Sequence, residues 1–233
     1  MNKKNINKNF QVLIPLRKGS KRIKNKNFVK INNKPLIHFT IKEVKKIFNN
    51  ENIFLSSNDI KAKKYALKNK LQFIERPDKL CKDNSSTEEA IIHFLNFQEK
   101  HKLNITKNLI LLQATSPLRK SYHILGSIKK FLSMNLDSLF SAYTEKCFLW
   151  KENKPQTKLI SISYNYKKRE RSQKLSKLIF ENGAIFIFKV SGFKKFKNRI
   201  FGNFNYYLMN KKYSVDIDNL NDLQRFRRNE KNE

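Results

Sequence analysis

Short apolar segments alternate with amphipathic segments along most of this chain, and this alternation is the feature that most restricts its fold. Strands are expected over residues 10–15, 52–56, 71–74, 109–112, 138–143, 184–188 and 204–209. Helices are expected over residues 36–48, 59–70, 86–100, 121–133 and 219–228. Because the strands are uniformly apolar, both faces of their sheet must be covered. The sequence therefore predicts an α/β fold, with a mostly parallel sheet flanked by helices.

The length of the chain favours one domain. Its 233 residues suffice for a single α/β domain with a sizeable core, so we expect one domain over residues 1–233. Residues 145–177 interrupt the alternation with a Lys-, Arg- and Ser-rich composition that has no sustained period. We expect this stretch to be an excursion from the core.

Hydropathy and cysteine usage indicate a cytoplasmic protein. No apolar run approaches the roughly 18–20 residues that span a bilayer. The basic first residues lack the apolar stretch of a secretory signal. Cys81 and Cys147 lie far apart without a C-x-x-C pair, which predicts reduced thiols rather than a zinc site. We therefore expect a protein of the cytoplasm without membrane attachment.

The formal net charge of +31 raises the question of nucleic-acid binding, because clustered cations neutralise phosphates. Here the lysines are spread over the whole chain instead of forming one tail or stripe. This distribution favours a composition bias on solvated faces, and we expect no specific nucleic-acid partner. An anionic small substrate would still benefit from the charge.

A basic loop follows the first expected strand. Residues 13–27 contain the cations Arg17, Lys21, Arg22, Lys24 and Lys26. Ligands of α/β proteins bind at the carboxyl ends of parallel strands, so these cations and the turn amides are suited to a polyphosphate. The spacing matches neither a P-loop nor a G-x-G-x-x-G dinucleotide motif. The alternative is an ordinary solvated loop.

Two further segments place polar side chains at strand ends. Residues 75–90 carry Arg76 just after a strand, and Ser85 and Thr87 at a helix entrance, where a plain N-cap is the alternative. Residues 111–119 run from an apolar strand into Gln113 and Arg119. Hydrogen-bonding groups there suit recognition of a base or sugar, although Ser-Pro is also ordinary turn chemistry.

A pair of carboxylates lies late in the chain. In an extended segment, residues two apart point to the same side, so Asp216 and Asp218 can present two carboxylates to one point. Together with water and phosphate oxygens, they would make a Mg²⁺ site. The alternative is that one of them caps the helix expected from residue 219, and both roles can coexist.

In this order, the segments resemble the acylneuraminate cytidylyltransferases, also called CMP-sialic acid synthetases. The motif R-x-x-S-K-x-x-x-x-K-N corresponds to Arg17, Ser20, Lys21, Lys26 and Asn27. The motifs R-P-x-x-L-x-x-D-x-[SA]-S-[ST], LLQ-[PA]-TSPLR, E-N-G-A-I-[YF] and S-[IV]-D-I-D correspond to residues 76–87, 111–119, 181–186 and 214–218. The similarity spans about residues 10–228. Each motif alone is a weak or moderate signal, but five motifs in the same order are specific for the family.

The resemblance implies a Rossmann-like fold of the nucleotide-diphospho-sugar transferase type. It also implies a homodimer, in which residues 145–177 reach the partner subunit. The reaction implied is attack by the anomeric hydroxyl of an acidic nine-carbon sugar on the α-phosphorus of CTP. Mg²⁺ assists, pyrophosphate leaves, and a CMP-sugar is formed.

The resemblance also implies roles for individual residues. Arg17 and Lys21 would hold the triphosphate and stabilise its developing charge, and Asp216 and Asp218 would bind the metal. The remaining substrate-binding positions, for the cytidine, the phosphates and the sugar acid, are Ser20, Lys26, Asn27, Arg76, Ser85, Thr87 and Gln113.

One part of the family pattern is displaced. Many relatives carry an arginine ten residues before the asparagine of the E-N-G segment, where this chain has Ser172 and its neighbour Arg171. Bacterial relatives often have a second arginine where this chain has Phe180. Arg171, or alternatively Arg169, is expected to meet the sugar carboxylate through a shifted loop.

Two kinds of alternative stay open. One is a cytidylyltransferase for another acidic sugar, such as legionaminate, pseudaminate or octulosonate. The octulosonate synthetases look less similar, because they lack a TSPLR-type segment. The other is a basic RNA-binding protein, against which stand the absence of evident aromatic platforms and the repulsion of phosphates by Asp216 and Asp218.

Overall fold

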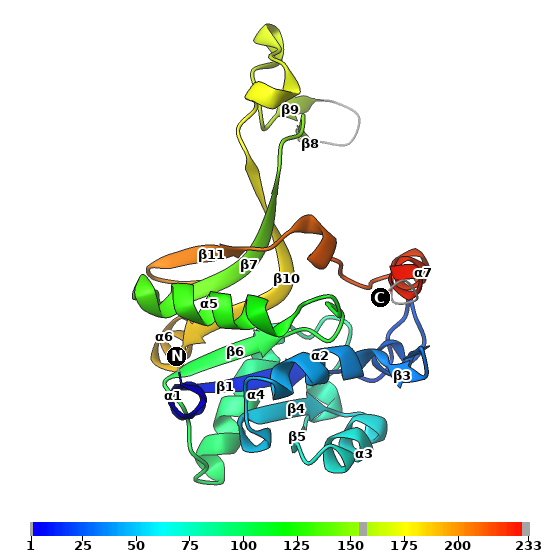
Figure 1. Ribbon diagram of the computed structural model, residues 1–233, viewed down its shortest axis with the longest axis vertical. Coiled ribbons are helices and arrows are strands. Elements are labelled where there is room, and N and C mark those ends of the chain that lie inside the picture. Colours follow the sequence, from blue (N-terminus) through cyan, green and yellow to red (C-terminus); the bar gives the residue numbers. More distant parts are fainter. Residues whose placement is uncertain (1, 154–157, 230–233) are drawn as a thin grey trace.

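The computed structural model describes residues 2–153 and 158–229, and its centre is a seven-stranded sheet in the order β11-β7-β10-β6-β1-β4-β5 (Figure 1). The strands are β1 (Phe10–Pro15), β4 (Ile53–Ser57), β5 (Gln72–Glu75), β6 (Asn108–Leu112), β7 (Ser138–Glu145), β10 (Leu178–Lys189) and β11 (Phe204–Leu208). Only β10 runs antiparallel to its neighbours, β6 and β7, whereas the other neighbouring pairs are parallel. The prediction of a mostly parallel sheet is therefore confirmed.

Helices cover both faces of this sheet. The helices of the described residues are α1 (Lys3–Asn9), α2 (Leu36–Lys45), α3 (Ile60–Lys68), α4 (Thr87–Lys100), α5 (Ser121–Ser133), α6 (Val190–Phe196) and α7 (Leu220–Asn229), of which α7 packs beside the sheet against the loops at the strand ends. Helices α2, α3 and α5 pack on one face and α4 and α6 on the other, as the two main core clusters show. The α/β class with helices on both faces is thus confirmed.

Strand β1 shows why the sheet must be covered twice. Val12 and Ile14 belong to the core under α2, α3 and α5, whereas Leu13 between them belongs to the core under α4 and α6. All three side chains are fully buried. Since successive strand residues point to opposite faces, a uniformly apolar strand requires a helical layer on each side.

A third apolar cluster fixes the loops around the carboxyl ends of the strands. Ile23, from the loop after β1, packs with Leu118 after β6 and with Ile217 and Phe226 near the C-terminus. The short antiparallel strands β2 (Lys30–Ile31) and β3 (Lys34–Pro35) complete the loop before α2. Segments almost 200 residues apart in sequence, such as Lys26 and Ile217, are therefore held side by side.

Strands β7 and β10 continue beyond the body as a two-stranded projection (Figure 1). At its end lie the antiparallel strands β8 (Trp150–Glu152) and β9 (Leu159–Ser161) and two short 3-10 turns, Tyr166–Lys168 and Ser172–Lys174. The projection occupies the stretch 145–177 for which the sequence predicts an excursion. Residues 154–157 of that stretch, and residues 1 and 230–233 of the expected domain, lie outside the described residues.

The described residues contain no helix with both the length and the apolar character needed to cross a membrane.

Candidate active site

A cavity of about 230 Å³ opens at the carboxyl ends of β1 and β6. Three segments far apart in sequence contribute its walls: the loops after β1 and β5 and the end of β6. The predicted substrate-site residues that line it are Arg17, Ser20, Lys26, Asn27, Arg76, Ser85, Thr87 and Gln113. The structure thus brings together residues that the sequence could only place at separate strand ends.

The basic loop after β1 is tied to the loop after β5 through Asp83. Arg17 Nη1 lies 2.5 Å from Asp83 Oδ1, and Lys21 Nζ lies 2.5 Å from Asp83 Oδ2. The hydrogen bonds from Lys21 and Arg17 hold the pKa of the Asp83 carboxyl below its usual range. Asp83 is a site residue that the sequence prediction missed, although it is the D of the second family motif.

Arg76 lies in the wall between the two loops and is almost fully buried. Its Nη2 donates to the carbonyl of Leu16 at 2.6 Å, and its Nε donates to Cys81 Sγ at 3.0 Å. The guanidinium therefore fastens the loop after β5 to the end of β1. This structural contact exists alongside the nucleotide-binding role predicted for Arg76.

The entrance of α4 combines capping with cavity lining. Ser86 Oγ accepts from the Glu89 N–H at 3.1 Å, and Glu89 Oε2 accepts from the Ser86 N–H at 2.6 Å, which is a capping box. The N-cap interpretation therefore holds for Ser86. Its neighbours Ser85 and Thr87 stay outside this pair of bonds and line the cavity.

The end of β6 is held by a buried arginine. Arg119 donates to the carbonyl of Gln113 at 3.1 Å and to the carbonyl of Ala184 on β10 at 2.8 Å. It also donates to Thr40 Oγ1 on α2 at 2.9 Å. The backbone of Gln113 is thereby fixed, while its side chain lines the cavity.

Asn182 joins β7, β10 and the C-terminal segment. Its Oδ1 accepts from the Ser141 hydroxyl at 2.6 Å and from the Ala184 N–H at 3.1 Å, and its Nδ2 donates to Ser214 Oγ at 2.9 Å. It lies where β10 shifts register against β7, next to Gly183 with φ +68°. The only sequence signal for this residue is the E-N-G segment of the family motif.

Asp216 and Asp218 lie on either side of Ile217, whose N–H donates to the carbonyl of Thr115 after β6 at 2.8 Å. Lys26 Nζ lies 3.0 Å from Asp218 Oδ1, and Arg22 Nη1 lies 3.1 Å from Asp218 Oδ2. Although burial opposes them, these cations lower the pKa of Asp218. Burial, reinforced by the charge of Asp218, raises the pKa of Asp216.

The start of α7 is capped by other residues. Asn219 Oδ1 accepts from the Asp222 N–H at 3.0 Å, and Asp222 Oδ2 accepts from the N–H groups of Asp218 and Asn219, each at 3.0 Å. These bonds leave the side chains of Asp216 and Asp218 out of the cap. Asp216 Oδ1 is buried and has no hydrogen-bond partner within the described part of the chain.

The arginines expected to meet the sugar carboxylate lie on the projection. The guanidinium carbon of Arg169 is 3.9 Å from the ring centre of Phe148, so this exposed residue stacks on an aromatic ring of the projection itself. Arg171 is exposed at the start of the turn Ser172–Lys174. Neither lines the cavity, and within one chain Arg171 is not brought to Arg17 and Lys21.

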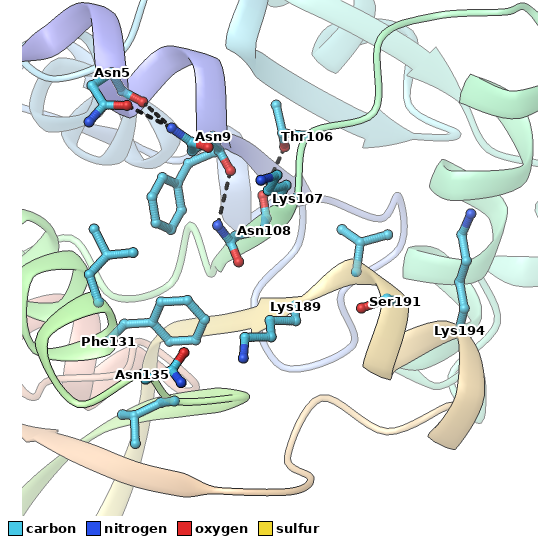
Figure 2. Close-up of a pocket in the computed structure, with 14 residues that line it drawn as sticks. Asn5, Asn9, Thr106, Lys107, Asn108, Phe131, Asn135, Lys189, Ser191 and Lys194 are labelled. Atoms are coloured by element: carbon cyan, nitrogen blue, oxygen red, sulfur yellow. Dashed lines mark hydrogen bonds between the residues drawn. The ribbon is translucent and has the colours of Figure 1, made fainter.

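A larger cavity of about 680 Å³ lies at the opposite end of the strands (Figure 2). Phe10 and Asn108, at the amino ends of β1 and β6, line it together with Phe131 and Lys189. The Lys189 ammonium is paired with Asp137 at 2.9 Å. None of the predicted site residues lies here, and ligands of open α/β sheets bind at the carboxyl ends, so the smaller cavity is the candidate active site.

The family model described as Cytidylyltransferase matches residues 11–149, which is more than half of the chain. The chain belongs to the cytidylyltransferase family. This confirms the resemblance seen in the motifs. The matched residues contain the loops after β1 and β5 and the end of β6, which form the cavity walls.

Curated members of the family are moderately similar to the chain. The N-acylneuraminate cytidylyltransferase of Streptococcus agalactiae is 29% identical over 91% of this chain and 51% of that protein. The enzyme of the same name from Escherichia coli is 28% identical over 91% of this chain and 50% of that protein. The chain therefore spans about half the length of these relatives. A pseudaminic acid cytidylyltransferase of Campylobacter jejuni is 28% identical over 91% of this chain and 92% of that protein.

Solved structures agree on the fold. A CMP:2-keto-3-deoxy-manno-octonic acid synthetase complexed with CTP superposes with a TM-score of 0.68 over 96% of this chain and 99% of that chain, at 11% identity. A 4-diphosphocytidyl-2C-methyl-D-erythritol synthase gives a TM-score of 0.68 over 94% of this chain and 96% of that chain, also at 11% identity. The Rossmann-like nucleotidyltransferase fold predicted from the sequence is confirmed.

Proposed function

We propose that this chain is an N-acylneuraminate cytidylyltransferase, which transfers CMP from CTP to an acidic nine-carbon sugar and releases pyrophosphate. The observation that carries the proposal is the convergence of three chain segments on one cavity, which the predicted nucleotide-site residues line. The names of the streptococcal and E. coli relatives support the same reaction.

The chemistry requires positioning and neutralisation of charge more than covalent participation by the protein. The anomeric oxygen of the sugar forms a bond to the α-phosphorus of CTP, the bond from that phosphorus to pyrophosphate breaks, and the hydroxyl proton passes to water. Arg17 and Lys21 lie in the loop after β1, where they would hold the β- and γ-phosphates and stabilise the leaving charge. Gln113, whose backbone Arg119 fixes, would orient the sugar acid.

The chemistry of the carboxylate pair is suited to a Mg²⁺ ion, although neither Asp216 nor Asp218 is among the residues that line the cavity. Buried Asp216 Oδ1 lacks a hydrogen-bond partner in the described part of the chain, and a cation would remove the cost of its burial. The described residues hold no group of three or more His, Cys, Asp and Glu side chains suited to a metal. Mg²⁺ commonly uses one or two carboxylates and completes its shell with water and substrate phosphates. When bound, it would neutralise the triphosphate, while Lys26 and Arg22 hold Asp218 in place.

We further propose that the protein acts as a homodimer through its projection. The projection exposes apolar side chains that a monomer leaves in water, namely Leu149, Trp150, Leu159, Ile160, Ile162, Tyr166 and Ile179. Burial of these side chains between two copies would be favourable. The arrangement would also let exposed Arg171 approach the cavity of the partner, where it would meet the sugar carboxylate.

Pseudaminate is a second candidate for the sugar substrate. The Campylobacter pseudaminic acid enzyme is matched over 92% of its length, whereas the N-acylneuraminate enzymes extend well beyond this chain. Because the pseudaminic acid enzyme is 28% identical to this chain, pseudaminate is the second candidate.

The test is release of pyrophosphate from CTP, with a panel that contains N-acetylneuraminate, pseudaminate, legionaminate and octulosonate. We expect turnover with N-acetylneuraminate, a poor rate with ATP, and a loss of about 100-fold or more in Asp216→Ala and Asp218→Ala. Glu51→Ala, a surface carboxylate beside Asn49, is the matched control and should keep full activity. If both aspartate variants melt cooperatively and keep full Mg²⁺-dependent activity, Asp216 and Asp218 are not the metal ligands.

A further inference from the structure

The two cations assigned to the triphosphate are already engaged by an internal anion. Both oxygens of Asp83 are used, one by Arg17 and one by Lys21, each at 2.5 Å. The Asp83 side chain is 43% exposed, so solvent and ligands can reach the bridge. Arg17 also lines the cavity, which places the bridge at its edge.

This arrangement requires competition when a phosphate binds. A carboxylate and a phosphate offer the same kind of anionic oxygen to Arg and Lys. A phosphate that contacted both cations would bring its own negative oxygens against Asp83, and like charges at that distance repel. The polyphosphate must therefore displace the carboxylate.

We propose that Asp83 is an internal competitor for the polyphosphate subsite, a specificity-determining residue that lowers the affinity for CTP and for pyrophosphate but not for CMP. Because it returns to Arg17 and Lys21 as the phosphates leave, it favours release of pyrophosphate after each transfer. The proposal rests on the function proposed above in assigning the two cations to the triphosphate.

The test compares Asp83→Asn with Asp78→Asn by titration calorimetry, with CTP, pyrophosphate and CMP as ligands and without divalent cations. Both variants remove one negative charge from the same loop. Asp78 accepts from Asn58 Nδ2 at 2.8 Å and makes no described ion pair, which makes it the matched control. Melting curves establish that both variants are folded.

In Asp83→Asn, the Kd values for CTP and pyrophosphate should fall about three- to tenfold, the scale of two solvent-exposed ion pairs. The Kd for CMP should stay within about twofold, and Asp78→Asn should match the parent protein for all three ligands. Pyrophosphate should also become a stronger product inhibitor of Asp83→Asn.

Unchanged or weaker binding of pyrophosphate in Asp83→Asn would overturn the proposal. Asp83 would then hold Arg17 and Lys21 in position without competing with the phosphates. Equal tightening of CMP would overturn it too, since the effect would not concern the polyphosphate subsite. The pyrophosphate titration does not depend on turnover. If pyrophosphate binds more tightly to Asp83→Asn while no sugar acid is activated, the proposed function fails and the role of Asp83 stands.

Discussion

The guanidinium of Arg119 lies wholly inside the protein, which is uncommon for a charged side chain. Burial lowers its pKa to about 9, although the nearby charge of Glu43 acts in the opposite direction. Its bonds to Gln113, Ala184 and Thr40 connect the end of β6 with β10 and α2. The family motif contains this arginine, but its position in the sequence alone does not distinguish a ligand contact from a structural one.

Replacement of Arg119 should be costly for stability. Arg119→Ala would leave the Gln113 and Ala184 carbonyls and the Thr40 hydroxyl without this donor and would open a cavity, so we expect a loss of about 3–5 kcal/mol in the free energy of unfolding. Urea denaturation measures this loss. Exposed Arg228→Ala should change the same quantity by less than about 0.5 kcal/mol. A loss below about 1 kcal/mol in Arg119→Ala would contradict the structural role.

The sequence predicted the cavity residues better than their connections. Arg17 and Gln113 could be placed at the ligand-binding edge because each follows an expected strand, and the strand ends of a parallel sheet meet at one edge. Asn27 was assigned from the family motif alone. Asp83 was missed, because an aspartate in a polar loop has no local pattern that identifies the cations facing it. Asn182 was missed for a similar reason, since its partners, Ser141 and Ser214, are distant in sequence.

At the scale of elements, six strands of the seven-stranded sheet were predicted to within two residues and with their mostly parallel direction, but the length and the reversal of β10 were not predicted. Apolar content marks a strand without giving its direction, so the reversal of β10 could not be seen. Residues 178–181 of β10 were also missed, because they pair with β7 at the root of the projection and have little apolar periodicity. The basic helix α1 was not predicted, because Ile6 is its single buried residue and the segment therefore has no apolar periodicity.

The first turn of α5 should make stability depend on pH. The Lys120 N–H donates to His123 Nδ1 at 3.0 Å, which requires a neutral imidazole. Burial, helped by the charges of Arg119 and Lys120, lowers the pKa of His123 to about 4. The unfolded chain therefore binds this proton first as the pH falls, and stability that is present above about pH 6.5 is lost toward pH 4.

Between about pH 7 and pH 4.5, the parent protein should lose about 2 kcal/mol more unfolding free energy than His123→Gln, whose side chain does not titrate. Urea unfolding at the two pH values gives this difference. His101→Gln, at an exposed position, should behave like the parent protein. The same pH dependence in all three proteins would show that His123 is not the titrating group.

At the scale of the whole molecule, the body buries its apolar side chains within one chain, whereas the projection leaves several of its own exposed. The body has its cores under both sheet faces, whereas the projection exposes Ile162 and Ile179 at 49% and 50%. The formal charge of +31 would oppose association of two copies at low ionic strength. The dimer proposed above would therefore rely on apolar contact.

We expect sedimentation to show a dimer at physiological salt and a monomer for the double variant Ile162→Asp, Ile179→Asp, because two carboxylates would have to be buried at the interface. The control is Leu67→Asp, an exposed apolar position on α3 of the body, which should stay dimeric. A dimer that survives the double substitution would place the interface elsewhere on the molecule.

The reversed strand β10 also determines when the sheet can be completed during synthesis. Strands β6 and β7 follow one another in sequence, yet β10 separates them in the sheet. A nascent chain that ends at residue 149 holds β1 and β4 to β7 but lacks the strand that connects β7 to the others. Until residue 189 has left the ribosome, β6 presents an unpaired edge, and this is the interval in which a chaperone would have most to protect.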